Sequence, residues 1–186
     1  MEKLKKVVFL DRDGVINRDS PDFVKSRDEF EFISGSLAAL SRLNENGFDT
    51  IVITNQSAIN RGIITRDTLE DMHRFLRTTT RQHGGQIKDI YFCPHRPDEG
   101  CSCRKPKLGM IQQACDRYAI DLDTAVMVGD RKKDIECGRN AGCGATVLVR
   151  TGSGLKAEKE LIDQHIPLDY IADNLQAAVD WIVDTR

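Results

Sequence analysis

The sequence predicts an α/β fold of three layers, in which a doubly wound, mostly parallel sheet lies between helices. Short apolar runs of strand length alternate along the chain with longer segments whose apolar residues recur at helical spacing. Repeated strand–helix units give a parallel sheet with helices on both faces. We find no internal repeat, low-complexity tract or linker, and 186 residues are enough for one full core. Residues 1–186 are therefore predicted to form one domain.

The expected strands share β-branched, aliphatic or aromatic residues over a short length. They cover residues 7–10, 50–53, 87–92, 125–128 and 145–149, with a further short strand near 170–171. The expected helices share apolar residues three or four positions apart. The five segments with this pattern are Leu37–Leu43, Leu69–Leu76, Ile111–Tyr118, Asp134–Ala141 and Leu175–Ile182. Glycines end three of the expected helices: Gly47 the first, Gly84 (approximately) the second and Gly142 the fourth. Residues 17–34 lack such a pattern and are predicted to form an irregular polar loop.

Composition and charge argue against several classes of protein. The chain is 40% hydrophobic and 30% charged, and its net charge of −2 gives no overall field that attracts nucleic acid or anionic lipid. No apolar run approaches the roughly 18 residues of a membrane span, and the first apolar stretch is too short for a signal peptide. We therefore expect a cytoplasmic monomer with no nucleic-acid or membrane partner. In that compartment the six cysteines are metal ligands or buried thiols rather than disulfides.

Two carboxylates, Asp11 and Asp13, directly follow the first expected strand, and Gly14 permits a sharp turn after them. The carboxyl edge of a parallel sheet is where α/β proteins bind ligands. Paired aspartates at that edge indicate a carboxylate nucleophile, a site for a hard metal ion, or both. Taken alone, an Asp-x-Asp pair after a strand is most often a solvated turn.

Polar residues also follow other expected strands, and a basic pair precedes the third helix. The residues concerned are Thr54, Asn55, Gln56, Ser57, Arg104, Lys105, Asp130, Arg131 and Asp134. Each group alone is explained by a turn, a helix cap or solvated surface, but a parallel sheet brings them all to one edge. Their joint occurrence favours a phosphoryl-transfer site over these separate explanations.

The chemistry of phosphoryl transfer needs such a mixture. Asp11 and Asp130 would supply oxygen ligands for Mg²⁺. Lys105 would place a positive charge, and Thr54 a hydroxyl, near the phosphoryl oxygens. Asp13 would remain free to act as general acid and then as general base.

These motifs resemble those of the haloacid dehalogenase superfamily of phosphatases, which has a Rossmann-like fold. Asp11-Arg12-Asp13-Gly14 matches the first motif, Thr54-Asn55 the second, Lys105 the third, and Gly129-Asp130 through Asp134 the fourth. The resemblance implies that Asp11 forms an aspartyl-phosphate and that Asp13 is the acid and then the base. It also implies Mg²⁺ held by Asp11, the backbone carbonyl of Asp13, and Asp130, with Asp134 behind these ligands.

The spacing of the motifs leaves no room for a separate cap domain. About forty residues separate Asp13 from Thr54, and about fifty separate Thr54 from Lys105. The helix and strand expected between each pair of motifs already account for the residues that separate them. We therefore expect loops, chiefly residues 17–34, to cover the site.

Residues 93–103 form a candidate zinc loop. Cys93, His95, Cys101 and Cys103 give the pattern C-x-H-x5-C-x-C, a complete ligand set for structural Zn²⁺. The alternative is a chance cluster of free thiols, whereas a DNA-binding zinc module is disfavoured by the negative charge. Because the loop ends just before Arg104, zinc would fix the backbone that aims the basic pair at a phosphate.

Other histidines and cysteines are assigned to the surface and to the core. His73, His83 and His165 are expected at the surface. Cys115, Cys137 and Cys143 are expected to be small buried hydrophobic residues.

The zinc loop, with Arg104-Lys105-Pro106 and Thr54-Asn55-Gln56-Ser57, is similar to a zinc-bearing subgroup of that superfamily. The subgroup contains heptose-bisphosphate phosphatases and histidinol-phosphate phosphatases, and the segment Val149-Arg150-Thr151-Gly152 is similar to the heptose enzymes. This resemblance implies removal of the 7-phosphate of D-glycero-D-manno-heptose 1,7-bisphosphate, in the synthesis of activated heptose for lipopolysaccharide core. The alternatives are a histidinol-phosphate phosphatase and a non-catalytic, zinc-stabilised phosphate- or nucleic-acid-binding module.

The same resemblance implies the residues that bind substrate. They are Asp11, Arg12, Asp13, Thr54, Asn55, Gln56, Ser57, Arg104, Lys105 and Arg131. Ala58, Asn60 and residues 19–25 depart from the subgroup's usual pattern. We expect these positions to face the sugar, so the sequence leaves the preferred anomer open.

Overall fold

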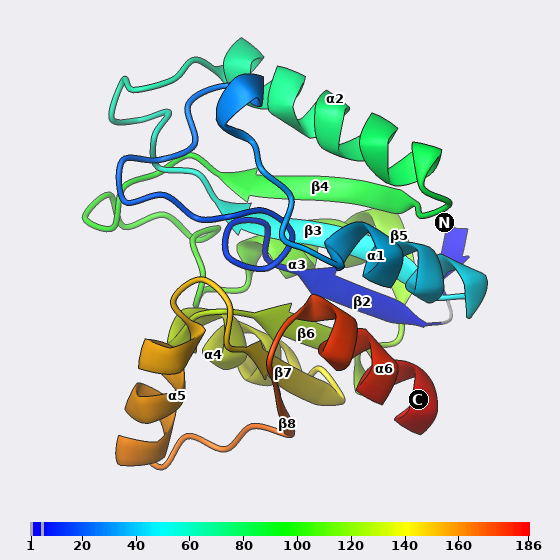
Figure 1. The fold of residues 1–186 in the computed structure, drawn as a ribbon. Coiled ribbons are helices and arrows are strands. Elements are labelled where there is room, and N and C mark those ends of the chain that lie inside the picture. The colour runs from blue at the N-terminus through cyan, green and yellow to red at the C-terminus, as the bar shows by residue number, and fades with distance from the viewer. Residues whose placement is uncertain (1, 5) are drawn as a thin grey trace.

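A computed structural model describes residues 2–4 and 6–186 and contains one six-stranded sheet, in which every pair of neighbouring strands is parallel (Figure 1). The strand order is β4-β3-β2-β6-β7-β8. Their bounds are β2 Val7–Leu10, β3 Asp49–Asn55, β4 Ile87–Cys93, β6 Val126–Gly129, β7 Ala145–Val149 and β8 Tyr170–Ala172. Outside this sheet, β1 (Glu2–Leu4) and β5 (Tyr118–Ile120) pair with each other in parallel.

Helices cover both faces of the sheet. The first face packs against α1 (Ser36–Glu45), α2 (Arg66–Gln82) and α6 (Leu175–Thr185). The opposite face packs against α3 (Gly109–Arg117), α4 (Lys132–Ala141) and α5 (Gly154–Asp163). Two short 3-10 helices, η1 (Arg27–Glu29) and η2 (Leu122–Thr124), lie in connections. Within the described residues, no helix is both long and apolar enough to cross a membrane.

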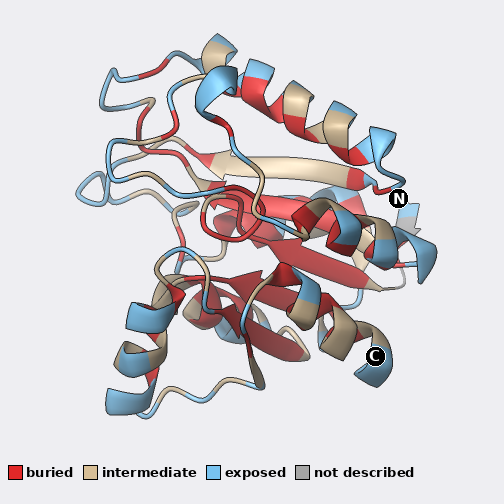
Figure 2. Ribbon diagram, viewed as in Figure 1, coloured by how far each residue is buried: buried red, intermediate tan, exposed pale blue. Residues whose placement is uncertain are grey.

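The central strand β2 shows why the strands read as continuous apolar runs. Val8 and Leu10 point into the core with α1, α2 and α6, whereas Val7 and Phe9 point into the core with α3 and α4. All four residues are buried, as Figure 2 shows for the middle of the sheet. A strand buried on both faces must be apolar on both, which removes the polar alternation of a half-exposed strand.

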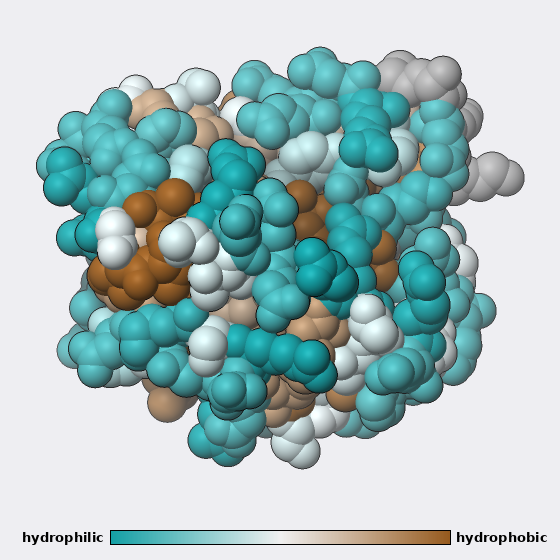
Figure 3. All heavy atoms as spheres, turned by 90° about the horizontal axis from the view of Figure 1, so that it is seen from above, coloured by the Kyte–Doolittle hydropathy of each residue, from teal (hydrophilic) through white to brown (hydrophobic). Residues whose placement is uncertain are grey.

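One face of the molecule is mainly polar. Figure 3, seen from above the view of Figure 1, shows a mostly hydrophilic face whose largest hydrophobic patch lies at its left, with smaller ones elsewhere. That side of the molecule carries the loops at the carboxyl ends of the strands (Figure 1).

The order of the strands places a ligand site between β2 and β6. The chain winds from β2 to β3 and β4 on one side, and then returns to β6, β7 and β8 on the other. The connections therefore diverge at β2 and β6, and α/β sheets bind ligands at the carboxyl end of such a point. Asp11 follows β2 and Asp130 follows β6, so both lie there.

The α/β class and the expected strands are confirmed, but three details differ from the sequence prediction. Tyr118 belongs to β5 rather than to the preceding helix, which ends at Arg117. The strand β1 and the helix α5 were not expected. In α5 the apolar pattern is blurred because Leu155 and Ile162, 68% and 61% exposed, lie outside its buried face.

The loop of residues 17–34 is ordered by a few specific contacts. It contains η1, an isolated bridge between Asn17 and Asp13 ties it to the first motif, and a second bridge between Asn17 and Phe32 joins its two ends. As expected, it covers the carboxyl edge of the sheet without a separate cap domain.

Candidate active site

Three carboxylates form the centre of the site. Asp11, Asp130 and Asp134 are buried, and each offers an oxygen within 4.8 Å of those of the other two. Asp11 and Asp130 are placed by β2 and β6, while Asp134 lies in the first turn of α4, where its Oδ2 accepts the Arg131 N–H at 3.0 Å. Burial, together with Asp134 and Asp11, raises the pKa of Asp130 to about 8. Burial also raises the pKa of Asp11.

Lys105 supplies a positive charge against this cluster. Its fully buried Nζ lies 2.9 Å from Asp11 Oδ1 and 2.8 Å from Asp134 Oδ1, and it donates to the Ile53 carbonyl at 2.7 Å. Burial alone would lower the pKa of Lys105, but the two carboxylates outweigh it and raise the pKa. One ammonium cannot balance three carboxylates, so a divalent cation would complete the charge.

The donor set fits Mg²⁺. Asp130 Oδ1 is buried and has no hydrogen-bond partner in the described part of the chain. Mg²⁺ prefers one or two carboxylates together with phosphate and water oxygens, which this cluster at the edge of a cavity can provide. The roles of Asp11, Asp130 and the Asp13 carbonyl as its ligands remain predictions.

Asp11 is oriented for attack on a ligand. Its Oδ1 accepts the backbone N–H of Arg12 at 2.8 Å and contacts Lys105. Its Oδ2 has no hydrogen bond in the described chain, and the residue lines a cavity of about 230 Å³. One oxygen is therefore held while the other is free to act as a nucleophile.

Asp13 is held by three side chains. Its Oδ1 accepts from Arg12 Nη2 at 2.7 Å and from Asn17 Nδ2 at 2.8 Å, and its Oδ2 accepts from Gln56 Nε2 at 2.7 Å. Burial by itself would raise the pKa of Asp13, but the Arg12 guanidinium and the three donors outweigh it and lower the pKa. Asp13 is thus a carboxylate in the free protein, placed at the edge of the cavity beside Asp11.

The cavity gathers nearly all of the predicted substrate-binding residues. Its walls include Asp11, Arg12, Asp13, Thr54, Asn55, Gln56, Ser57, Arg104 and Arg131. Lys105 lies behind Asp11 and lines a neighbouring cavity instead. Asp19, Ser20, Pro21, Phe23 and Val24, from the loop expected to cover the site, also line the cavity.

Several of these side chains are already engaged. The Asn55 amide donates to the Lys105 carbonyl at 3.3 Å and accepts its N–H at 3.1 Å, so it fixes the Lys105 backbone. Thr54 Oγ1 accepts from Gln56 Nε2 at 3.0 Å. Arg131 pairs with Asp19 across the mouth of the cavity.

Two expectations about residues near the site are wrong. Ala58 is fully buried in the core, and Asn60 donates to Glu99 at 2.7 Å, so neither lines the cavity. His73 is not on the surface but 8% exposed, with Nε2 3.4 Å from Arg12 Nη1. Burial and the Arg12 charge lower the pKa of His73 to about 3. His83 and His165 are exposed as expected.

The turn at residues 151–153 was not predicted as part of the site. Thr151 Oγ1 donates to the Gly14 carbonyl at 2.6 Å, and the Ser153 N–H donates to Asp130 Oδ2 at 2.8 Å. Gly14 and Gly152 both have positive φ, and a Cβ on either would lie 2.3 Å from Asp130 Oδ2. The turn therefore holds the Asp130 carboxylate close to the first motif. This close approach leaves no room for a Cβ, which explains why both positions are glycine.

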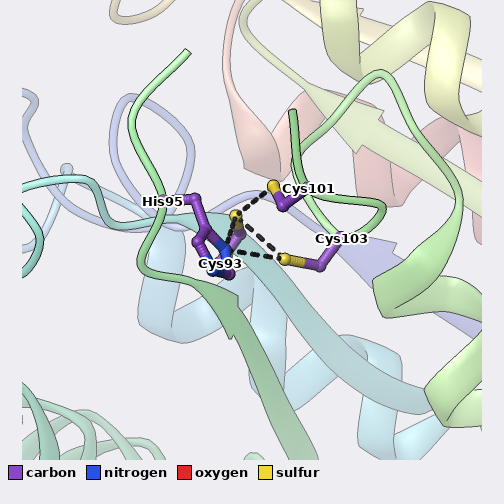
Figure 4. A group of neighbouring side chains, drawn as sticks. All are labelled: Cys93, His95, Cys101 and Cys103. Atoms are coloured by element: carbon purple, nitrogen blue, oxygen red, sulfur yellow. Dashed lines mark hydrogen bonds between the residues drawn. The ribbon is translucent and has the colours of Figure 1, made fainter. Parts of the chain in front are cut away.

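The zinc loop brings its four predicted ligands together. Cys93 is at the end of β4, and the other three lie in the loop that follows (Figure 4). Cys93 Sγ lies 3.6 Å from Cys101 Sγ and 3.1 Å from Cys103 Sγ, while His95 Nδ1 lies 3.5 and 3.3 Å from Cys93 and Cys103. In a tetrahedron with Zn–S near 2.3 Å, the donor atoms are roughly 3.5–3.8 Å apart, so the cluster can hold zinc with little adjustment.

The loop is linked directly to the cavity. Arg104 Nη1 donates to the carbonyl of His95 at 3.0 Å, and Lys107 Nζ donates to the carbonyl of Cys101 at 2.6 Å. A metal that fixes the loop would therefore also fix Arg104 at the wall of the cavity. Of the remaining cysteines, Cys137 is buried, whereas Cys115 and Cys143 are half-buried.

Comparisons with known proteins agree with this geometry. A HAD-hydrolase-like family model matches residues 102–178. The D-glycero-β-D-manno-heptose-1,7-bisphosphate 7-phosphatase of Pseudomonas aeruginosa is 45% identical over 82% of this chain and 85% of that protein. The chain belongs to this haloacid dehalogenase-like family of heptose-bisphosphate phosphatases.

Other family members support the assignment. The α-anomer phosphatase of Photorhabdus laumondii is 38% identical over 79% of this chain and 84% of that protein. The crystal structure of the D,D-heptose 1,7-bisphosphate phosphatase of B. bronchiseptica, complexed with magnesium and phosphate, superposes with a TM-score of 0.90. It is 38% identical and covers 97% of this chain and 99% of that one.

Proposed function

We propose that this protein is a magnesium-dependent phosphatase that removes the 7-phosphate of D-glycero-D-manno-heptose 1,7-bisphosphate. The observation that carries the proposal is the free Oδ2 of Asp11 at the cavity wall, beside Lys105 and the carboxylates Asp130 and Asp134. The names of the relatives supply the substrate. The product would then enter the synthesis of activated heptose for lipopolysaccharide core.

The residues suggest a reaction in two halves. Asp11 Oδ2 attacks the phosphorus atom, the bond from phosphorus to the sugar oxygen breaks, and Asp13 gives that oxygen a proton. Asp13 then takes a proton from a water molecule, whose oxygen attacks the phosphorus of the aspartyl-phosphate. Inorganic phosphate leaves and the Asp11 carboxylate is restored.

The arrangement around Asp13 suits both halves. In the free protein its low pKa keeps it ionised, as a base must be. A bound phosphate brings negative charge next to it, which raises its pKa and favours the protonated acid. Gln56 and Asn17 hold the carboxylate in place throughout.

Metal ions would serve two separate purposes. Bound Mg²⁺ would neutralise the charge between the attacking carboxylate and the phosphate, held by Asp11, the Asp13 carbonyl and Asp130. Zinc on Cys93, His95, Cys101 and Cys103 would have no open position, and would stabilise the loop that carries Arg104.

We further propose that the enzyme prefers the β-anomer, because the relative with 45% identity is named for it and the one named for the α-anomer is 38% identical. We also propose that residues 1–186 act as a single domain, as a monomer in the cytoplasm. None of the six cysteines forms a disulfide, which is typical of a reducing compartment.

The test is phosphate release from a panel that contains both anomers of heptose 1,7-bisphosphate and histidinol phosphate. We expect the highest kcat/KM for the β-bisphosphate, dependence on Mg²⁺, and loss of turnover in Asp11→Asn. Faster hydrolysis of histidinol phosphate would overturn the proposed substrate. Full activity of Asp11→Asn would overturn the covalent route.

A further inference from the structure

We propose that Lys133 binds the phosphate that the reaction leaves in place, and thereby makes the enzyme prefer a sugar bisphosphate over the monophosphate. This inference rests on the proposed function and names the residue that would select its substrate. Lys133 was not among the residues expected at the site from sequence.

The first argument is that the other cations of the site are engaged. Lys105 contacts Asp11 and Asp134, and Arg12 contacts Asp13. Arg131 pairs with Asp19, and Arg104 donates to the carbonyl of His95.

Lys133 differs from these cations. It lines the same cavity but makes no ion pair or hydrogen bond within residues 2–4 and 6–186. A half-buried ammonium without a protein partner is available for an anionic ligand.

The second argument is the position of Lys133 at the junction of three cavities. Besides the cavity of about 230 Å³ that contains Asp11, it lines one of about 310 Å³ with Lys132 and Lys156. It also lines one of about 360 Å³ with Arg104 and Lys107. Both neighbouring cavities are rich in basic residues, and neither contains Asp11.

The size of the substrate makes this junction relevant. Ligand pockets are usually about 300–1,000 Å³, and the cavity at Asp11 is smaller than this range. A sugar with a phosphate at each end must therefore extend beyond it when one phosphate lies against Asp11. Its second phosphate would reach the neighbouring cavities, where the Lys133 ammonium has no ion pair at contact distance, although the charges of Asp134 and Asp11 act on it.

The experiment compares two substrates in two variants. Lys133→Gln removes the charge, and Lys159→Gln is the matched control, because Lys159 is an exposed lysine of α5 that lines none of the three cavities. The kcat and KM of each are measured on heptose 1,7-bisphosphate and heptose 7-phosphate. Lys133→Arg tests rescue by another cation, and thermal unfolding checks the fold of each variant.

We expect Lys133→Gln to lower kcat/KM about 10- to 100-fold for the bisphosphate, mostly through KM, as for loss of a hydrogen bond to a charged group. The monophosphate should change by less than about 2-fold, Lys133→Arg should recover much of the loss, and Lys159→Gln should resemble wild type.

Two results would overturn the assignment. An equal fall in kcat/KM on both substrates would place Lys133 at the transferred phosphate, and wild-type kcat and KM on both substrates would remove it from recognition. Failure of the proposed function is distinguishable from both, because in that case the wild-type enzyme itself would not turn over either heptose substrate.

Discussion

Lys105→Met removes a buried charge while keeping a side chain of similar length. In the structure, Lys105 Nζ lies 2.9 Å from Asp11 and 2.8 Å from Asp134, and the side chain is 0% exposed. The variant leaves two buried carboxylates without their cation. It also leaves the Ile53 carbonyl without the hydrogen bond that Nζ donates at 2.7 Å.

The cost follows from that geometry. Removal of one partner of a buried ion pair typically costs about 3–5 kcal/mol, because the remaining charge stays buried and unpaired. For a protein of this size, each kcal/mol lowers the melting temperature by roughly 2–4 °C, so we expect a fall of roughly 6–20 °C without Mg²⁺. Saturating Mg²⁺ should return part of this loss, since a cation bound to Asp11 and Asp130 replaces some of the missing charge.

Differential scanning fluorimetry with and without Mg²⁺ measures both effects. Lys107→Met is the control, because Lys107 is exposed and contacts only backbone carbonyls. The double variant Lys105→Met, Asp134→Asn should regain some stability, since it carries one buried carboxylate fewer. A melting temperature of Lys105→Met within about 2 °C of the control would refute the view that Lys105 neutralises the cluster.

Three further predictions concern the surroundings of the site. Because the pKa of His73 is lowered to about 3 from an ordinary 6.5, folding favours the neutral ring, and this contribution is lost as the pH falls below 6.5. Between pH 7 and pH 5, the free energy of unfolding of the wild type, measured with urea, should fall by about 2 kcal/mol more than that of His73→Gln. If the unfolding free energies of the two proteins changed equally with pH, this prediction would be contradicted. Cys103→Ser should lose its zinc by elemental analysis and up to about 100-fold in kcat/KM through misplaced basic residues, whereas Cys143→Ser should keep both. Gly152→Ala, with a Cβ 2.3 Å from Asp130, the carboxylate predicted to bind magnesium, should weaken Mg²⁺ binding in a fluorimetric titration. The control Gly62→Ala, at φ +69° but with open space around the new Cβ, should leave Mg²⁺ binding unchanged. Equal weakening of Mg²⁺ binding in both variants would exclude the clash with Asp130 as the cause.

Much of the fold could be predicted because its central strands are buried on both faces. Such strands are continuous apolar runs, so β2, β3, β6 and β7 were visible in the sequence. The helix α5 was missed because its buried face consists of small and widely spaced residues, while two large apolar side chains point to solvent. Tyr118 was misplaced because its side chain is buried at helical spacing although its backbone pairs with β1.

The site was predictable where residues follow strands in sequence. Asp11, Asp13 and Asp130 are adjacent to strand ends, and the topology alone brings them together. Contacts between distant segments were not visible. His73 is a polar residue on a helix, and only the fold shows that it faces Arg12. Lys133 follows two other basic residues in sequence, and only the positions of the neighbouring cavities separate it from Lys132.

In the proposed reaction, an aspartate oxygen at the end of β2 receives the phosphoryl group. Rapid acid quench during the first turnover, followed by peptide mass spectrometry, tests it most directly. We expect a transient phosphoryl group on the peptide that contains Asp11, absent from Asp11→Asn. Product formed with no phosphopeptide at any time, or a phosphoryl group on another residue, would contradict it.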